Sequence, residues 1–347
     1  MEKERLKKAV ALLVMWYREN QRELPWRKEP DGYAVWISEI MLQQTRIEAV
    51  IPYYERFMKE LPDVKALSEV SEERLLKLWE GLGYYSRARN LKKAAGIVME
   101  NGGSLPIEAE KLRKLPGIGD YTAGAISSIA FGQPEPAVDG NVLRVVMRFL
   151  ARDDDVLSPK TKKAVAEILR EVYPSGKDAA LLTEGLMELG ETLCLPNGEP
   201  KCEGCPLRSL CLAKERGLEA KLPVRKEKAP RRAEERTVFL ISCGRKTALC
   251  RRPEKGLLAE LWEFPNTVGK LAPEEARKWL SEQGLSVLKI EPCGEAKHIF
   301  THVEWHMTGY RVIVVKEKNY VWKTPEEIRD KFAIPSAFSF FLGKILF

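Results

Sequence analysis

The sequence predicts a multidomain chain in which an all-α domain with a cysteine-rich loop precedes a smaller α+β domain. Two observations indicate the first domain: apolar residues recur at three- and four-residue spacing within residues 1–217, and four cysteines fall between positions 194 and 211. β-rich runs within residues 237–347 indicate the second domain. A chain of 347 residues is long for one domain and comfortable for two.

The predicted helices of the first domain include 46–61, 72–82 and 89–101, each with an apolar face at helical spacing. The stretch LPGIGDYTAGAI, 115–126, interrupts this pattern. Its proline and two glycines end one helix and form a tight hairpin, and a second helix is predicted over 122–131. The first domain is therefore expected to contain two helices joined by a glycine-rich hairpin.

Residues 218–236 are predicted to be a linker, because they are highly charged, contain two prolines and show little periodicity. The second domain, 237–347, contains the β-rich runs 237–243, 247–252 and 298–315. One helical stretch, PEEARKWLSEQG, lies among them at 273–284. Strands with a single inserted helix favour an α+β fold.

Composition argues against a membrane protein and favours a polyanionic partner. No run reaches about 18 apolar residues, so no transmembrane helix is expected. The N-terminal stretch 1–20 fits an amphipathic helix better than a signal peptide, because its apolar run is short and interrupted. The net charge is +7 and the pI is about 8.9, which suits nucleic acid. A cytoplasmic, nucleoid-associated location is expected.

The cysteine cluster predicts a metal centre. Cys194, Cys202, Cys205 and Cys211 form a C-x7-C-x2-C-x5-C pattern, and four thiolates in one short loop can hold a [4Fe–4S] cluster or a zinc ion. Zinc sites usually show two close cysteine pairs; because only one is present here, the spacing favours the iron–sulfur cluster and leaves zinc open. Four unrelated thiols within 18 residues would be unusual.

The hairpin at 115–119 predicts an anion site. Leu115 leads into Gly117 and Gly119, where backbone N–H groups can point outward together next to a helix N-terminus. Such a nest contacts a phosphate without reading base sequence. Taken alone, however, the same stretch fits an ordinary corner between helices better than an anion site.

Two carboxylates stand out in apolar surroundings. Glu39 lies in VWISEIMLQQT, where burial would raise its pKa and make it an acid near neutral pH, unless it lies on a polar stripe with Gln43. Asp139 opens the apolar helix of PAVDGNVLRVVMRF, where its ordinary role is a helix cap. Cleavage of a glycosidic bond needs two carboxylates. The acids, the hairpin and the cysteines together predict an enzyme that acts on DNA.

These residues closely resemble the adenine DNA glycosylase family, MutY, of the helix-hairpin-helix superfamily. The resemblance spans most of the chain. It rests on the cysteine pattern and on six strings: LPWR (24–27), WISEIMLQQT (36–45), GLGYYSRARNL (81–91), LPGIGDYTAGAI (115–126), VDGNVLRV (138–145) and GLLAELWEFP (256–265). It implies removal of adenine mispaired with 8-oxoguanine or guanine, after the adenine is extruded from double-stranded DNA. It also implies a [4Fe–4S] cluster; we expect a monomer.

The resemblance assigns roles to individual residues. Glu39 would protonate adenine, Asp139 would stabilise or capture the sugar cation, Asn141 would orient that region, and Tyr121 would lie beside the sugar. Residues that would line the adenine pocket are Arg22, Leu24, Trp26, Arg27 and Glu184. Gln44 and Tyr84 would wedge into the base stack. Read without the resemblance, Trp26 and Tyr84 would be packed aromatics and Gln44 a solvated helix residue.

Tyr121 predicts the type of glycosylase. Relatives of the endonuclease III type have a lysine at this position, which attacks the sugar and then drives strand cleavage. A lysine amine can form a Schiff base and a phenol cannot. Asp120 next to it, and DGN in place of the relatives' DTH, agree with a monofunctional enzyme that leaves an abasic strand uncut.

The second domain resembles the family's Nudix-like domain. It lacks the glutamate-rich REx2EE helix of a working Nudix hydrolase, so recognition without hydrolysis is implied. Phe300, Thr301 and His302 match the loop that contacts 8-oxoguanine, with Thr in place of Ser but the hydroxyl kept. His298, His302 and His306 recur every four residues and would share a face if helical, but their neighbours favour strand and loop over a zinc site.

Two departures and two other functions remain open. The first cysteine gap has seven residues where six are usual, so one residue should bulge from the loop, and Glu260 replaces a usual glycine. A thymine–guanine mismatch glycosylase would use a similar pocket. A non-catalytic iron–sulfur DNA-binding protein would not need Glu39 and Asp139, whose joint presence weighs against it.

Overall fold

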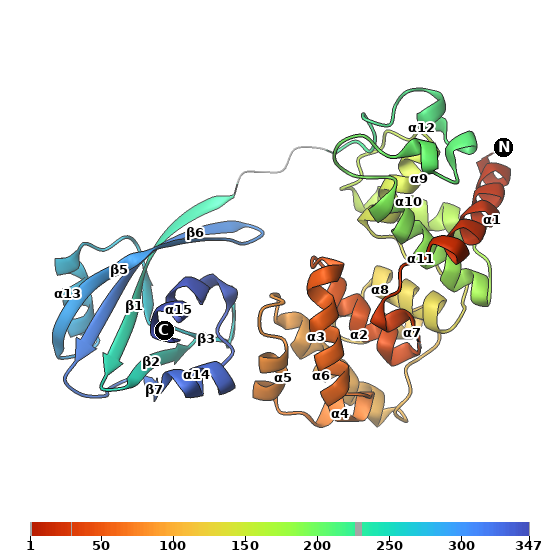
Figure 1. Ribbon diagram of the computed structural model, residues 1–347. Helices are drawn as coiled ribbons and strands as arrows, with labels where there is room; N and C mark the ends of the chain where they lie inside the picture. The colour runs from red at the N-terminus through yellow and green to blue at the C-terminus, as the bar shows by residue number, and fades with distance from the viewer. Residues whose placement is uncertain (1, 29, 226–230, 347) are drawn as a thin grey trace. The chain divides into compact units, whose positions relative to one another are not determined.

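The computed structural model describes residues 2–28, 30–225 and 231–346. The chain forms two compact units, each considered by itself. The helical unit comprises residues 1–69 and 90–227, and the sheet unit comprises residues 70–89 and 228–347 (Figure 1). The predicted combination of a helical domain and an α+β domain is confirmed.

The helical unit contains no strand in its described residues, as the apolar spacing predicted. Its longer helices are α1 (Glu2–Asn20), α2 (Gly32–Leu42), α3 (Ile47–Glu60), α9 (Gly140–Phe149), α10 (Pro159–Arg170) and α11 (Lys177–Thr192). Shorter ones are η1 (Pro25–Arg27), α4 (Val64–Glu69), α7 (Ala109–Leu112), α8 (Asp120–Ala125), η2 (Ile126–Ala130), η3 (Cys202–Gly204), η4 (Arg208–Leu210) and α12 (Leu212–Glu215). α6 (Ser86–Glu100) runs across the boundary between the two units.

α11 lies at the centre of one core of this unit. α1 and α9 both pack against it, and Leu13, Val142, Leu182 and Leu189 are buried among them. Gly190 permits the close approach of α9, because a Cβ there would lie 2.6 Å from the Cβ of Asn141. The close approach of these two helices brings the start of α9 next to α11.

The hairpin predicted at 115–119 joins α7 to α8, but the helix predicted over 122–131 is not one regular helix. α8 begins at Asp120, and the chain continues as the π-helical turn η2. The hydroxyl of Ser128 donates to the carbonyl oxygen of Gly124 at 2.7 Å, a side-chain contact that competes with regular helix bonding. Single π-helical turns are frequent at functional sites.

The sheet unit is built on a mixed sheet with the order β3-β2-β1-β6-β5, which β4 and β7 join beside β1 and β2. Its strands are β1 (Arg232–Cys243), β2 (Lys246–Arg251), β3 (Trp262–Glu263), β4 (Asn266–Val268), β5 (Val287–Ile299), β6 (Val303–Val314) and β7 (Val321–Lys323). β1 and β6 pair in parallel; the other pairs are antiparallel. The helices of this unit are α5 (Glu72–Leu78), α13 (Pro273–Glu282), α14 (Pro325–Lys331), η5 (Ser336–Phe338) and α15 (Ser339–Leu346).

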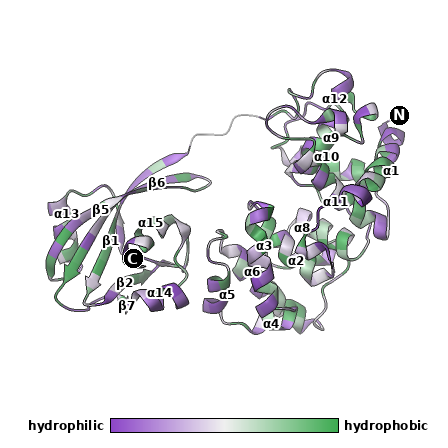
Figure 2. Cartoon of the chain, viewed as in Figure 1, coloured by the Kyte–Doolittle hydropathy of each residue, from purple (hydrophilic) through white to green (hydrophobic). Residues whose placement is uncertain are grey.

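Both faces of β1 are buried, which explains its continuous apolar run. Val238 and Leu240 pack on the side of α14 and α15, whereas Phe239 and Ile241 pack on the side of α13. Neighbouring residues of a strand point to opposite faces, so one run serves two cores. Along β1 the colouring in Figure 2 changes from hydrophilic at its start to hydrophobic.

Two features of the sheet unit differ from what the sequence patterns predict. β5 was not anticipated, because Pro292 and Gly294 are residues that usually interrupt strands. The strand accommodates them at a register shift in its pairing with β6. β1 begins at Arg232, inside the predicted linker; of that linker, residues 226–230 lie outside the described residues. The domain bounds at 217/218 and 236/237 stay predictions.

Within the described part of the chain, no helix is long and apolar enough to cross a membrane.

Candidate active site

A cavity of about 590 Å³ in the helical unit collects most of the predicted site residues. Its walls come from α2, α8, α9, α11 and the segment around η1. Ten predicted residues line it: Arg22, Leu24, Trp26, Arg27, Glu39, Gln44, Tyr121, Asp139, Asn141 and Glu184. The fold therefore brings together side chains that are spread along the sequence from position 22 to position 184.

Glu39 is a buried acid on α2. Asp31 caps this helix by accepting the backbone N–H of Ala34 at 2.6 Å, and every residue from 33 to 41 is buried. Burial raises the pKa of Glu39 to about 7, and the nearby Asp139 and Glu184 act in the same direction. The hydroxyl of Tyr121 donates to Oε2 of Glu39 at 2.6 Å and lowers that pKa. The raised pKa predicted from the apolar surroundings is confirmed, so the side chain is partly protonated near neutral pH.

Asp139 caps α9 and also lines the cavity. Its Oδ1 accepts the backbone N–H of Val142 at 2.7 Å, and its Oδ2 accepts Nδ2 of Asn141 at 3.0 Å. Burial raises the pKa of Asp139, whereas hydrogen bonds from the backbone N–H groups of Val142 and Asn141 lower it. The capping role and the position in the cavity are therefore compatible, and the cap holds the carboxylate in place.

Arg144, which was not predicted as a site residue, orients Asn141 by a hydrogen bond to the side-chain oxygen of its amide group. It is 3% exposed and donates Nη2 to Oδ1 of Asn141 at 2.9 Å and to the carbonyl oxygen of Gly190 at 2.7 Å. Its Nε donates to the carbonyl oxygen of Cys194 at 2.6 Å. One turn further, Nη1 of Arg148 lies 3.3 Å from Sγ of Cys194. The sequence feature that could have indicated Arg144 is its spacing from Arg148: two arginines four residues apart on an otherwise apolar helix.

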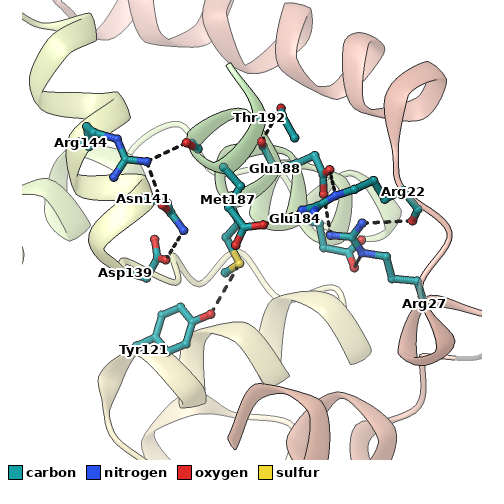
Figure 3. Close-up of polar contacts among 12 residues, drawn as sticks. Arg22, Arg27, Tyr121, Asp139, Asn141, Arg144, Glu184, Met187, Glu188 and Thr192 are labelled. Carbon is teal, nitrogen blue, oxygen red and sulfur yellow. Dashed lines mark hydrogen bonds and ion pairs between the residues drawn. The ribbon is translucent and has the colours of Figure 1, made fainter. Parts of the chain in front are cut away.

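A second group of charges lies on the other side of the cavity (Figure 3). Glu188, which was also not predicted, accepts hydrogen bonds from Nε of Arg22 and, at 3.0 Å, from Nη2 of Arg27. Nε of Arg27 lies 3.2 Å from Oε1 of Glu184, and Nη2 of Arg22 donates to Glu191 at 2.6 Å. Burial raises the pKa of Glu184 and Arg27 lowers it. Glu184 and Glu188 are four residues apart, which puts them on one face of α11.

Four further predicted residues lie in the sheet unit. Tyr84, Phe300, Thr301 and His302 line a second cavity, of about 520 Å³. The hydroxyl groups of Tyr84 and Thr301 are 2.8 Å apart, and Phe300 packs edge-on against Trp305. These four residues therefore form a separate group in the structure.

Gln44 and Tyr84, the two predicted wedge residues, share an uncommon backbone conformation. Their φ angles are +60° and +48°, in the left-handed region that non-glycine residues seldom adopt. Such strained positions tend to cluster at functional sites. Both side chains are exposed, and Gln44 lies at the edge of the main cavity.

The hairpin presents two glycines at its surface. Leu115 and Ile118 are buried and anchor it, whereas Gly117 and Gly119 are exposed. Gly117 has φ +81°, and a Cβ there would lie 2.8 Å from the Cβ of Asn90. Only glycine meets both requirements without strain, so the backbone of this turn stays accessible.

The four clustered cysteines come together in space. Cys194, Cys202, Cys205 and Cys211 line one small cavity beside Arg148, and none of them forms a disulfide. Residues 196–199, which lie within the longer first gap, are exposed, in line with the predicted bulge. Within the described residues, no group of three or more Cys, His, Asp or Glu side chains is already arranged as a metal site. Four free thiols around one cavity nevertheless fit a thiolate-bound cluster in ligand type and number.

Two further expectations can be compared with the structure. His298 lies in β5, His302 in the turn after it and His306 in β6, so the three do not share a helix face, and the helical zinc alternative is not supported. Glu260 adopts φ +59°, which keeps the left-handed turn that a glycine would allow, and its carboxylate lies 3.5 Å from Arg89.

Comparison with known proteins agrees with this arrangement. Residues 37–175 match the HhH-GPD superfamily base excision DNA repair proteins, and residues 237–343 match the NUDIX domain. The adenine DNA glycosylase of Mus musculus is 35% identical over 84% of this chain and 68% of its own length. The chain belongs to the adenine DNA glycosylase family. It is thus a base-excision repair DNA glycosylase.

Other adenine DNA glycosylases give similar values. The Homo sapiens protein is 33% identical over 84% of this chain and 64% of its own length. The protein of Buchnera aphidicola subsp. Acyrthosiphon pisum is 33% identical and is covered over 84% of its length. The longer relatives therefore have segments that this chain does not match.

Solved structures of DNA glycosylases share the helical fold. A thermostable thymine-DNA glycosylase matches 61% of the chain with a TM-score of 0.55 and 28% identity. A non-covalent complex of endonuclease III with DNA matches 62% with a TM-score of 0.52 and 24% identity, which supports the fold alone.

Proposed function

We propose that this protein removes adenine paired with 8-oxoguanine or guanine in double-stranded DNA, and that it hydrolyses the N-glycosidic bond without cutting the strand. One observation carries the proposal: a buried acid with a pKa of about 7, Glu39, lines the same cavity as a second carboxylate, Asp139. This is the pair that glycosidic cleavage requires. The names of the relatives supply adenine as the base.

Glu39 is the general acid of this proposal. Near neutral pH Glu39 is protonated in a substantial fraction of the molecules, and it donates this proton to N7 of the extruded adenine. Protonation turns adenine into a better leaving group. The tyrosine hydrogen bond keeps the acid from becoming too weak, because it opposes the effect of burial on the pKa.

Asp139 stabilises the oxocarbenium-like sugar as the bond breaks, or captures it briefly as a covalent adduct. The cap at Val142 and the contact with Asn141 hold the carboxylate before substrate arrives, so little reorganisation is needed during the reaction. Tyr121, in place of a lysine, has no amine with which to form a Schiff base, and the abasic strand is released intact.

The adenine pocket is lined by two apolar and three charged side chains. Leu24 and Trp26 are buried at its wall and offer an apolar surface to the base, whereas Arg22, Arg27 and Glu184 offer polar contacts. The adenine must leave the base stack to reach the pocket. Gln44 and Tyr84 fill the gap left behind.

The sheet unit supplies the opposite-base check. Phe300, Thr301 and His302 contact 8-oxoguanine, and the hydroxyl of Thr301 serves as a hydrogen-bond donor or acceptor. Without the glutamate-rich helix of a Nudix hydrolase, this unit recognises 8-oxoguanine and does not cleave pyrophosphates.

DNA backbone contacts come from the hairpin formed by Leu115, Gly117 and Gly119. The two exposed glycines present backbone N–H groups to a phosphate, whereas the N–H of Leu115 donates to the carbonyl oxygen of Leu112 at 3.0 Å and anchors the turn. Cys194, Cys202, Cys205 and Cys211 would hold a [4Fe–4S] cluster through their thiolates, which would brace the loop between α11 and α12. We further propose that the protein acts as a monomer in the cytoplasm, at the nucleoid.

Single-turnover assays test this proposal. Duplexes carry adenine opposite 8-oxoguanine, adenine opposite guanine, or thymine opposite guanine, and products are compared with and without alkali. Adenine release with strand breaks only after alkali, and at least about a 100-fold loss in Glu39→Gln, is the expected result. Release of thymine instead would favour the mismatch alternative, for which the likeness to a thymine-DNA glycosylase is the reason. Tight DNA binding with no base release would favour the non-catalytic alternative.

A further inference from the structure

Glu188 is the most deeply buried acid of the charged group that it forms with Arg22, Arg27, Glu184 and Glu191. Its side chain is 1% exposed, and its two oxygens accept hydrogen bonds from two different arginines, Arg22 and Arg27. A buried carboxylate of this kind is held in place by its partners, and it holds them in turn. Neither the sequence patterns nor the family match assigns it a role.

Arg27 is shared between two carboxylates of α11. Its Nη2 bonds to Oε2 of Glu188 at 3.0 Å, whereas its Nε lies 3.2 Å from Oε1 of Glu184. Its Nη1 donates to the carbonyl oxygen of Arg22 at 3.2 Å, which fixes the plane of the guanidinium. An arginine with a single carboxylate partner prefers a pair of parallel bonds to both of its oxygens. Here Arg27 meets Glu184 through one nitrogen, because the other end of the fork is held by Glu188.

The hydrogen-bonding groups of adenine indicate how the contact between Arg27 and Glu184 could affect base recognition. One edge of adenine carries an acceptor, N7, beside a donor, the exocyclic amino group. In the proposed function, on which this inference rests, Glu39 donates to N7. The neighbouring amino group then needs an acceptor, and an ionised Glu184 provides one if its oxygens are not both occupied by Arg27.

We propose that Glu188 is a specificity-determining positioning residue, which keeps Arg27 from pairing with both oxygens of Glu184 and so leaves Glu184 free to accept the amino group of adenine. If Glu188 loses its charge, Arg27 turns to the nearest remaining carboxylate. Recognition of the amino group weakens, while the acid and the second carboxylate are untouched.

Excision of two bases opposite 8-oxoguanine separates this role from a structural one. The bases are adenine and unsubstituted purine, which keeps N7 and lacks the amino group. In Glu188→Gln the single-turnover rate for adenine should fall by about 10- to 100-fold, the value of one charge-assisted hydrogen bond. The rate for purine should change by about 2-fold or less. An equal loss for both bases, or no loss for either, would overturn the inference.

Asp178→Asn is the matched control. It removes a carboxylate from the same helix, α11, where Asp178 pairs with Arg18 at 2.6 Å on the surface, and the ratio of the two rates should stay at the wild-type value. If Glu188→Gln does not fold, as judged by thermal unfolding, Glu188→Asp keeps the charge on a shorter side chain and should lower the adenine-to-purine ratio by a smaller factor. If the wild type releases adenine from none of the duplexes, the proposed function fails. If the wild type releases adenine but the adenine-to-purine ratio is unchanged in the Glu188 variants, only the role of Glu188 fails.

Discussion

The hydroxyl of Tyr121 donates a 2.6 Å hydrogen bond to Oε2 of Glu39, and this contact opposes the effect of burial on the acid. The two residues are 82 positions apart and belong to α8 and α2. The resemblance implies a lysine at this position in relatives of the endonuclease III type, and the tyrosine here has two consequences. It removes an amine nucleophile, and it adjusts the pKa of the proposed acid.

Tyr121→Phe should move the alkaline limb of the pH–rate profile upward. The hydrogen bond lowers the pKa of Glu39, so its loss should raise that pKa from about 7 by about one pH unit. Single-turnover adenine release, measured between pH 6 and pH 9.5, reports the position of this limb separately from any fall in the maximum rate. A limb that moves to lower pH would contradict the assignment of Glu39 as the acid.

Glu39→Gln should stabilise the fold at alkaline pH. The folded pKa of about 7 lies above the value near 4.3 expected for an unfolded chain, so between these values the folded state holds a proton that the unfolded state has lost. Stability contributed by this group is complete below the lower value and is lost as pH rises through the upper one. The variant should gain on the order of 1–3 kcal/mol at pH 8 and little near pH 4.5, measured by urea unfolding. An equal gain at both pH values would point to packing as its cause.

Tyr121→Lys should create strand-cleaving activity. An amine at this position can attack the sugar and form a Schiff base, which borohydride reduces to a stable protein–DNA adduct. The wild type and Tyr121→Phe serve as controls and should give no adduct and no strand breaks before alkali. An adduct in the wild type would mean that another lysine carries out the lyase reaction.

Arg144→Gln should impair both stability and excision. Arg144 makes three hydrogen bonds below 3.0 Å, to Asn141 and to the carbonyl oxygens of Gly190 and Cys194. Their loss leaves buried acceptors without partners at a cost of about 2–4 kcal/mol, and an unrestrained Asn141 should slow excision about 10-fold or more. Arg18→Gln, which alters only an exposed pair with Asp178, should change neither unfolding nor rate.

Thr301→Ala should weaken the preference for 8-oxoguanine over guanine opposite adenine. Its hydroxyl lies 2.8 Å from that of Tyr84, and the substitution removes it without a change of backbone. The ratio of single-turnover rates for the two duplexes should fall by about 3- to 10-fold, whereas Thr301→Ser should keep it near the wild-type value. If both variants kept the ratio, the discrimination would reside elsewhere.

The sequence by itself determined the class of each domain and the residue types of the site. Apolar spacing indicated a helical domain, and the glycine positions indicated the hairpin at 115–119, because both are local properties of the chain. The surroundings of Glu39 predicted its raised pKa for the same reason, since nine consecutive residues of α2 are buried. β5 was missed because a local rule, that proline and glycine interrupt strands, is overridden by a bulge in a paired sheet.

Only the tertiary structure decided which buried charges meet. Arg22 and Glu188 are 166 residues apart, and Arg144 is 50 residues from Cys194. No periodicity along the chain reports such pairs, because a buried arginine is stabilised by whichever carboxylate or carbonyl oxygen the packing of α9 and α11 places beside it. The same packing brings a cap residue, Asp139, and a buried acid, Glu39, into one cavity, so the two carboxylates that the sequence indicated lie together.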